Sequence, residues 1–495
     1  MKINERRGQK NWRLGLVLAV LLGGILLAAC QPQPTAPPLT SQPTLTPVPV
    51  VSPTPLPERL VYSPGQLVDY IAQTGDTLPA LASHFNTTIE EIREANPIIP
   101  NDATTMPPGF PMQIPIYYEP FWGTPFKILP NSLFINGPAQ TDFDTGAFIA
   151  SQPGWLKSYE QYAGDKQRTG AEIIDYIATN FSVSPRLLLA VLEYQLEALS
   201  NPVPPQDLED YPLGYEERTH TGLYMQLVWA TNTLNNGYYG WLTGRLDTLE
   251  HLDSTIENPD PWQNAGSVAL QYYFSLLLPK DAYQKAIGPD GFAQTYQQLF
   301  GDPWLTPSHI PGSLRQPEML LPFERGRTWS LTGGPHTGWG KGEPWAALDF
   351  APPGVSGCGR SKAWAAAAAS GVVTRSETGI VELDLDGDGN PRTGWVIFYL
   401  HIATQGRIPL GAWVEAGEKI GFPSCEGGTS SGTHLHIVRK YNGEWVSADG
   451  VIPFNLEGWI ANNGATAYSG MLTRFSQIVI ANDKSSRVSH ITAGE

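Results

Sequence analysis

The sequence predicts a multidomain α+β protein, with a βααβ module near its start, an α-helical middle domain and an all-β C-terminal domain. Its 495 residues are enough for two to four domains. Apolar residues recur with helical spacing between residues 170 and 300, whereas short β-rich segments alternate with Gly and Pro turns beyond Leu321. The 50 glycines and 45 prolines predict many turns and linkers.

Residues 1–30 have the features of an export signal. Basic residues precede an apolar run over residues 14–29, which is too short for a comfortable transmembrane helix. The run ends in Leu27-Ala28-Ala29-Cys30, which resembles a bacterial lipobox. The resemblance implies cleavage before Cys30, lipidation of its thiol and stable attachment to a membrane through acyl chains. A plain signal peptide or a short membrane anchor is the alternative, and every version places the rest of the chain outside the cytoplasm.

Residues 31–57 form a Pro/Thr-rich linker. They contain ten prolines and no charged residue, so they cannot build a core. The composition predicts an extended tether of roughly 80 Å, at ~3.1 Å per residue. Such a tether lets the folded part of the chain reach away from a membrane.

A βααβ module is predicted over residues 68–118. A β-like stretch leads to a Gly75-Asp76 turn, two helical patterns follow, and Met112–Pro115 forms a closing strand. This unit closely resembles a LysM module in residues spread over its whole length: Tyr70, Gly75, Asp76, Thr77, Leu78, Ala82, Phe85, Ile92, Ala95, Asn96, Pro108, Gly109, Ile114 and Pro115.

The LysM resemblance implies binding to glycans that contain N-acetylglucosamine, such as peptidoglycan or chitin. In that family the groove lies between the first strand–helix loop and the second helix–strand loop. The implied walls are therefore Gly75, Asp76, Thr77 and Leu78 on one side and Asn96, Pro97 and Ile98 on the other. A LysM fold that has lost sugar binding is the alternative.

The middle domain is predicted to be α-helical over residues 128–312. Ser184-Pro185 is a good N-cap and first-turn pair for one of its helices. The phrases SPRLLLAVLEYQ and GLYMQLVWATNTL resemble the core of lytic transglycosylases, but Gln195 stands where the catalytic Glu belongs, between Glu193 and Glu197. Glutamine cannot act as a general acid. We therefore expect a helical spacer or glycan-binding domain, with a glycan-cleaving enzyme as the rival.

The C-terminal domain, residues 320–472, carries a pair of histidines in GTHLHIVRK. On a strand, His434 and His436 point to the same face, ~7 Å apart. Two surface histidines would be the ordinary interpretation of an isolated pair. However, His336, Asp349 and His401 stand in neighbouring β-rich motifs, and His and Asp are zinc ligand types.

The order His…Leu-Asp-Phe…Tyr-Leu-His…Gly-Thr-His-Leu-His resembles the lysostaphin-type (LytM-like) zinc endopeptidases, which have a duplicated-hybrid-motif fold. The resemblance implies that His336, Asp349 and His436 hold one Zn²⁺ and that His401 and His434 are catalytic. Family substrates are the peptide stems and cross-bridges of peptidoglycan. The expected function is therefore zinc-dependent hydrolysis of peptidoglycan peptides, targeted by the glycan-binding module.

One departure from the family pattern bears on this expectation. The first His and the Asp are normally three residues apart, whereas the twelve residues TGWGKGEPWAAL separate His336 from Asp349. A Gly-rich loop can bulge out and still bring both ligands together. Alternatively, His336 has left the metal, and the protein is an inactive wall-binding or amidase-regulating lipoprotein.

Two cysteines remain once Cys30 is lipidated, and an extracytoplasmic compartment permits disulfides. We therefore predict a Cys358–Cys425 bridge, with free thiols or thiolate metal ligands as alternatives. Residues 473–495 are left as a tail without an assigned role.

The stretch DLDGDGN looks like the start of an EF-hand calcium loop, with Asp384, Asp386 and Asp388 at positions 1, 3 and 5. Position 12 is Trp395 instead of Glu, and the flanks read as strands. A weak Ca²⁺ site competes with an acidic hairpin turn. The net charge of −16 and the lack of a basic cluster argue against nucleic-acid binding.

Overall fold

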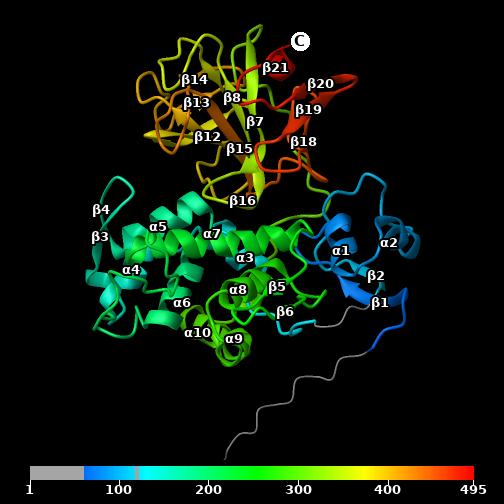
Figure 1. The fold of residues 1–495 in the computed structure, drawn as a ribbon, viewed down its shortest axis with the longest axis vertical. Coiled ribbons are helices and arrows are strands. Elements are labelled where there is room, and N and C mark those ends of the chain that lie inside the picture. The colour runs from blue at the N-terminus through cyan, green and yellow to red at the C-terminus, as the bar shows by residue number, and fades with distance from the viewer. Residues whose placement is uncertain (1–60, 118–121, 495) are drawn as a thin grey trace, which may run out of the picture. The chain divides into compact units, whose positions relative to one another are not determined.

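The computed structural model describes residues 61–117 and 122–494 (Figure 1). The lipobox with Cys30 and the linker 31–57 lie outside these residues. Among the helices that the structure describes, none is both long and apolar enough to span a membrane.

The N-terminal module has the predicted βααβ order. Strands β1 (Gln66–Ile71) and β2 (Pro111–Ile116) pair antiparallel, and helices α1 (Leu78–His84) and α2 (Ile89–Ala95) lie between them in the chain. Each helix begins at a threonine: the Thr77 hydroxyl accepts from the N–H of Ala80, and Thr88 forms a reciprocal capping box with Glu91. The LysM-like fold is thus confirmed for this module.

The middle domain is helical, as expected. Ser184 caps helix α6 (Pro185–Leu196), because its side chain accepts from the N–H of Leu187, and Pro185 stands in the first turn. The longest of the described helices, α7 (Gly222–Leu242), packs against α5 (Gly170–Phe181) and α8 (Ala265–Ser275). The helices are α3 (Asn131–Phe134), α4 (Thr145–Ala150), α5 (Gly170–Phe181), α6 (Pro185–Leu196), α7 (Gly222–Leu242), α8 (Ala265–Ser275), α9 (Lys280–Ile287) and α10 (Phe292–Phe300). Two small hairpins accompany them, β3 (Glu160–Ala163) with β4 (Lys166–Thr169), and β5 (Leu249–Glu250) with β6 (Ile256–Glu257).

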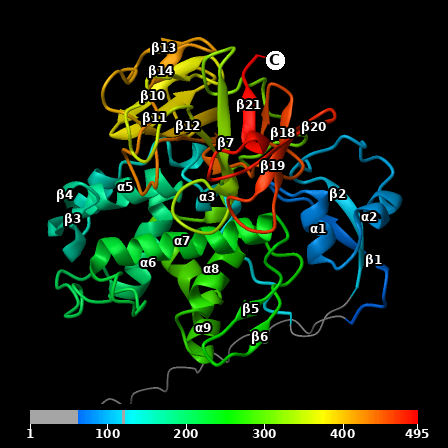
Figure 2. The ribbon, with the colours of Figure 1, turned by 45° about the horizontal axis from the view of Figure 1, so that its top comes forward.

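The C-terminal domain is built from antiparallel sheets, which Figure 2 shows from a second direction. The largest sheet has the order β13-β10-β11-β12-β15-β8-β7-β21, with β16 paired to β15. Its strands are β7 (Thr328–Thr337), β8 (Trp345–Ala351), β10 (Gly371–Glu377), β11 (Gly379–Asp384), β12 (Trp395–Ile402), β13 (Trp413–Val414), β15 (Leu435–Tyr441), β16 (Glu444–Trp445) and β21 (His490–Thr492). A four-stranded sheet contains β17 (Asn455–Leu456), β18 (Trp459–Asn463), β19 (Gly470–Arg474) and β20 (Gln477–Ile480), and β9 (Ala365–Ala366) pairs with β14 (Lys419–Gly421).

The segment that the sequence leaves as a tail is part of this fold. Strand β20 extends the four-stranded sheet, and β21 pairs with β7 at the edge of the large sheet. The side chain of Ile491 is buried in the core of the domain. Residues 473–494 therefore complete the two sheets.

The helical domain shares a core with one face of the large sheet. Phe398, Val438 and Trp445 belong to the same buried cluster as the helices α5, α6 and α7. The Tyr238 hydroxyl donates to Glu444 at 2.7 Å, and the N–H of Trp445 donates to the Tyr239 hydroxyl at 3.0 Å.

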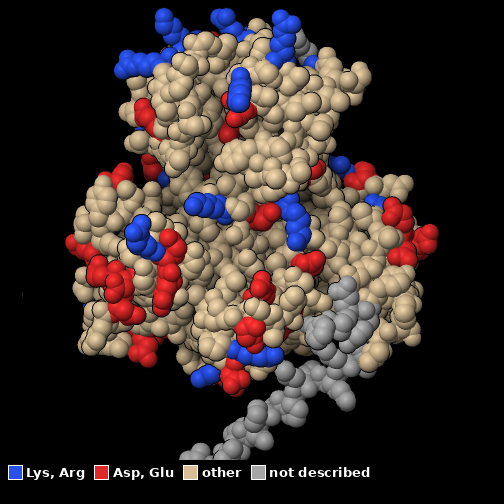
Figure 3. All heavy atoms as spheres, viewed as in Figure 1, with Lys and Arg blue, Asp and Glu red and all other residues tan. Residues whose placement is uncertain are grey.

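On the face drawn in Figure 3, acidic side chains are frequent over the helical domain, in keeping with the negative net charge.

Candidate active site

Three side chains converge where β7, β8 and β15 lie side by side. The register pairs His436 directly with Asp349, and His336 lies at the irregular end of β7 opposite Ala347. The Asp349 Oδ1 atom is 3.1 Å from His436 Nδ1 and 3.3 Å from His336 Nε2, and the two histidine nitrogens are 3.1 Å apart. All three side chains are buried. The three predicted metal ligands therefore meet at one point.

Backbone carbonyls fix which nitrogen each of these histidines turns to that point. His336 donates its Nδ1–H to the carbonyl of Gly334 at 2.8 Å, and His436 donates its Nε2–H to the carbonyl of Gly338 at 3.1 Å. The remaining nitrogens, His336 Nε2 and His436 Nδ1, then present lone pairs toward the Asp349 carboxylate. Converging acceptors of this kind suit a cation, and two imidazoles with one carboxylate are a zinc ligand set with an open position.

The two predicted catalytic histidines face each other beside this set. The ring centroids of His401 and His434 are 4.4 Å apart, and His434 Nε2 is 3.7 Å from Asp349 Oδ1. His401, the next-to-last residue of β12, has a φ of +65°, an unusual conformation for a residue other than glycine. The Nδ1–H of His401 donates to the Glu426 carbonyl at 2.9 Å, and that of His434 to the Gly432 carbonyl at 2.8 Å. Both Nε2 atoms are left as proton acceptors.

Burial and the pairing of charges set the electrostatics of the site. Although burial opposes it, the neighbouring His336 and His436 hold the pKa of Asp349 well below its usual range. Burial lowers the pKa of His401 to about 4, with His434 and His436 acting in the same direction. At neutral pH the site therefore holds a charged carboxylate next to a neutral imidazole.

The segment between His336 and Asp349 is docked against helix α7. The N–H groups of Lys341 and Glu343 donate to the side-chain oxygens of Asn232 and Asn236, each at 2.7 Å. Glu343 also pairs with Arg245, just beyond the end of α7. The inserted residues thus bulge out to the helical domain while leaving His336 at the metal set, and Gly338 within them orients His436.

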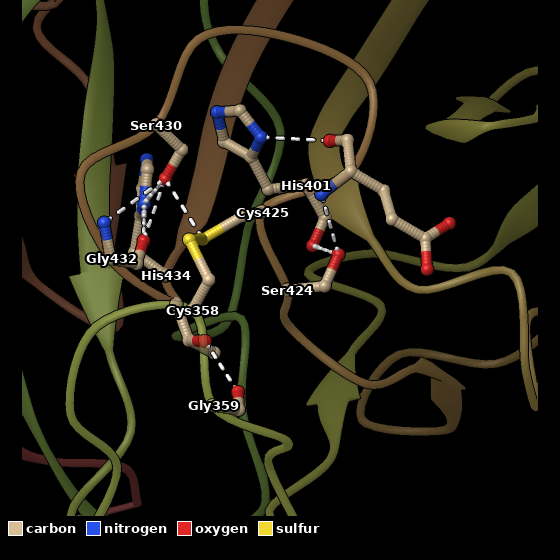
Figure 4. The surroundings of a disulfide bond; sticks show 10 residues. Cys358, Gly359, His401, Ser424, Cys425, Ser430, Gly432 and His434 are labelled. Carbon is tan, nitrogen blue, oxygen red and sulfur yellow. Dashed lines mark hydrogen bonds between the residues drawn. A yellow bond between two sulfur atoms is a disulfide. The ribbon is translucent and has the colours of Figure 1, made fainter.

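The predicted disulfide is present and lies beside His401 and His434 (Figure 4). Cys358 and Cys425 have Cα atoms 5.6 Å apart. The bridge joins the loop after β8 to the loop that carries the carbonyl partner of His401. Thr433 reinforces this link because its N–H donates to the Gly357 carbonyl at 2.7 Å. Figure 4 shows the disulfide beside both His401 and His434.

Comparisons with known proteins found relatives for several parts of this chain. A family model described as "LasA, N-terminal domain" matches residues 127–313, and the LysM domain model matches residues 70–115. Protease LasA of Pseudomonas aeruginosa is 26% identical over 341 residues, covering 65% of this chain and 75% of that protein. The beta-lytic metalloendopeptidase of Achromobacter lyticus is 28% identical over 198 residues, covering 38% of this chain and 48% of that protein.

Among solved structures, the M23 metalloprotease pseudoalterin from the deep sea is 27% identical, with a TM-score of 0.29, over 34% of this chain and 96% of that one. This chain is a homologue of bacterial metalloendopeptidases. Its C-terminal metallopeptidase domain keeps an intact His-Asp-His set.

A large cleft opens above the active site of the metallopeptidase domain. Its volume is about 1160 Å³, and its lining includes all five site residues but neither cysteine of the disulfide. The Tyr468 ring stacks on His336 with centroids 4.0 Å apart, and burial together with the nearby Asp349 raises the pKa of Tyr468. This tyrosine brings a neutral phenol to the site. Sequence reasoning missed it because Tyr468 stands in a turn without any motif.

The LysM residues expected to bind glycan lie in two different environments. Gly75 and Leu78 are buried, and Gly75 lies against Leu242 at the end of α7. Asp76 accepts from the Tyr70 hydroxyl and from the N–H of Gln73, each at 2.7 Å. Burial raises the pKa of Asp76 to about 6.

The opposite wall of the expected groove is more accessible. The Asn96 side chain bonds to the backbone of Ile92 and Gln113, so it holds the fold together. Pro97 is exposed, and the Ile98 side chain is 77% exposed. Thr77 caps α1 and is half-buried. The surface offered to a glycan by these residues therefore consists mainly of Pro97 and Ile98.

In the helical domain, Gln195 and Glu193 serve the fold. The Gln195 side chain accepts from the Tyr273 hydroxyl at 2.7 Å. The Glu193 carboxylate accepts from the N–H groups of Leu199 and Ser200, which lie just beyond the end of α6. The position of the transglycosylase catalytic Glu is thus held by a glutamine that bonds to Tyr273 and cannot act as a general acid.

The acidic loop between β11 and β12 brings three carboxylates together. One ligand oxygen from each of Asp384, Asp386 and Asp388 lies within 4.8 Å of the others. Asp384 accepts from the N–H of Gly389 through Oδ2 at 2.9 Å, while its Oδ1 is buried without a hydrogen-bond partner among the described residues. The flanking elements are strands, as the sequence indicates.

Proposed function

We propose that this protein is a zinc metalloendopeptidase that hydrolyses peptide bonds in the stems or cross-links of peptidoglycan. One observation carries the proposal. Five side chains from four adjacent strands and their ends point at one cleft, and backbone carbonyls set the tautomer of all four histidines. Three residues, His336, Asp349 and His436, would hold the zinc ion, while His401 and His434 would remain for proton transfer.

In this reaction the zinc ion and the two remaining histidines have different roles. When bound, zinc supplies Lewis acidity to the scissile carbonyl and to a water molecule. One neutral imidazole of the His401–His434 pair takes a proton from water as the new C–O bond forms. It returns that proton to the leaving nitrogen as the C–N bond breaks. The other imidazole stabilises the negative charge that develops on the carbonyl oxygen.

We further propose that the LysM module delivers the peptidase to the glycan of the cell wall. Its match to the LysM family model and the exposed pair Pro97–Ile98 support this role. The lipobox at Cys30 would keep the protein on the outer side of a membrane, with the 31–57 linker as a tether. The Cys358–Cys425 disulfide fits such an extracytoplasmic location.

The reaction class can be tested by the products of peptidoglycan digestion. A soluble protein that starts after the linker is expected to release new amino termini and to leave the glycan strands intact. Products that contain anhydro-sugars with intact peptides would instead establish the transglycosylase rival. Binding to peptidoglycan without any new terminus would establish the inactive wall-binding alternative.

We also propose a weak Ca²⁺ site at Asp384, Asp386 and Asp388. The support is the buried Asp384 Oδ1, an acceptor that lacks a hydrogen-bond partner in the described part of the chain and that a cation would satisfy. Tb³⁺ is expected to bind here, with luminescence sensitised by Trp413, whose ring lies beside Gly387. Saturation is expected at about 10⁻⁴–10⁻³ M, as for weak extracellular calcium sites.

The control for this measurement separates the loop from the zinc site. The Tb³⁺ signal should disappear in Asp388→Asn and persist in His436→Ala, and Ca²⁺ should compete with it. A signal that survives Asp388→Asn, or no saturable signal at all, would establish the acidic hairpin turn instead.

A further inference from the structure

The active-site cleft continues across the boundary between two domains. One side contains the metal set and the catalytic histidines. The other side is formed by residues of helices α5 and α7, namely Tyr176, Asn180, Phe181, Tyr224 and Val228. The helical domain therefore borders the site without filling it, and the His434 side chain keeps 17% of its surface exposed.

Polar contacts hold this second side firmly in place. Arg375 of β10 donates to the Asn180 side-chain oxygen at 2.9 Å, and the Trp445 indole N–H donates to the Phe181 carbonyl at 3.2 Å. The inserted residues after His336 reach across to Asn232 on α7. A wall fixed by such contacts can position a ligand without paying for its own ordering.

The wall presents two tyrosines at its surface. The rings of Tyr176 and Tyr224 have centroids 6.2 Å apart, and both side chains are half-buried. Burial raises the pKa of each, that of Tyr224 to about 12, so both hydroxyls stay neutral. Each ring combines an apolar face, negative at its centre, with a hydroxyl group. A sugar ring complements this surface, because it offers C–H groups on its faces and hydroxyls around its edge.

The size of the cleft indicates that more than the scissile peptide is bound. A volume of about 1160 Å³ exceeds the 300–1,000 Å³ that is typical of small-ligand pockets. The peptide bond itself must lie at His401 and His434, on the metallopeptidase side. The helical side is therefore free to contact whatever is attached to that peptide.

We propose that Tyr176 and Tyr224 form a subsite for the sugar unit that carries the peptide being cut. This proposal rests on the proposed peptidase function and names a further part of its substrate. It gives the helical domain a role in recognition, since the domain adds a saccharide-binding wall to a peptide-cleaving site.

The test compares two substrates that share one peptide. The first is a synthetic cross-link peptide without sugar, and the second is the same peptide attached to a soluble glycan fragment. Tyr224→Ala and Tyr176→Ala are each expected to raise KM for the sugar-linked substrate roughly 3- to 10-fold, with kcat unchanged. Neither should alter kcat/KM for the free peptide. Tyr224→Phe, which keeps the ring, should lose less than Tyr224→Ala.

Controls separate this subsite from the fold and from the LysM module. Tyr162→Ala removes a tyrosine that is 65% exposed and lies outside the cleft, so KM and kcat for both substrates should stay unchanged. The LysM module is identical in all variants, so its contribution cancels. Thermal unfolding identifies any variant that is destabilised, and the other tyrosine then provides the measurement.

Equal losses on both substrates, or no loss on the sugar-linked one, would overturn the subsite. If the wild type hydrolyses neither substrate, the proposed peptidase function fails separately. The same comparison by equilibrium binding needs no turnover, and it still decides whether Tyr224 contributes to sugar affinity.

Discussion

His436→Ala is expected to remove the zinc ion and to reduce hydrolysis of peptidoglycan peptides by at least about a thousandfold. The substitution removes His436 Nδ1, the proposed ligand atom, which lies 3.1 Å from both Asp349 Oδ1 and His336 Nε2. A metal ion contributes several kcal/mol to the stabilisation of transition-state charge, and this is the contribution that would be lost. Zinc per chain and the appearance of new amino termini are measured on the same samples.

His336→Ala tests whether the long insertion preserves the metal site. We expect the same loss of zinc, because Gly334 orients His336 toward Asp349 in the folded protein. His490→Ala is a matched control, since His490 is exposed on β21 and should keep full zinc and activity. If His436→Ala loses a weak metal while His336→Ala changes nothing, then His336 is not a ligand, and the domain is better described as a binder.

Substitution of either histidine proposed to be catalytic is expected to separate hydrolysis from metal binding. His401→Ala and His434→Ala should each keep near-stoichiometric zinc but lower kcat roughly 10²- to 10⁴-fold, the usual contribution of general acid–base catalysis. The geometry supports this separation, because both side chains line the cleft while their Nδ1–H groups donate to the carbonyls of Glu426 and Gly432.

The double variant adds a further check on this pair. If both imidazoles act in one proton-transfer sequence, the combined loss should be much smaller than the product of the two single losses. Loss of zinc from His401→Ala would contradict the assignment and place His401 among the ligands. His220→Ala, in the helical domain and outside the cleft, serves as the control.

Local patterns in the sequence were sufficient to predict much of the fold. Thr88, four residues before Ile92, marks the start of α2, and Ser184-Pro185 marks the start of α6. Strand alternation places His434 and His436 on one face, and the structure brings both to one cleft. These features depend on contacts between near neighbours in the chain, so they can be read from a single sequence.

Other features depend on partners far away in the chain. The insertion after His336 keeps its shape through Asn232 and Asn236, about a hundred residues earlier, and no local pattern connects these positions. Tyr468 reaches His336 only because the four-stranded sheet packs beside β7. The aromatic wall on α5 and α7 is equally non-local, since its tyrosines meet the cleft only when two domains share a core.

The disulfide has a consequence for when the enzyme becomes competent. Cys425 lies in the loop between β14 and β15, from which the carbonyls of Glu426 and Gly432 orient His401 and His434, and the bridge ties this loop to the one that carries Cys358. In a reducing cytoplasm the two thiols stay apart, and these loops lose their covalent link. Full organisation of the histidine pair then awaits transfer to an oxidising environment. If the proposed function holds, catalytic competence would be coupled to export, and the newly made chain would acquire its activity outside the cytoplasm.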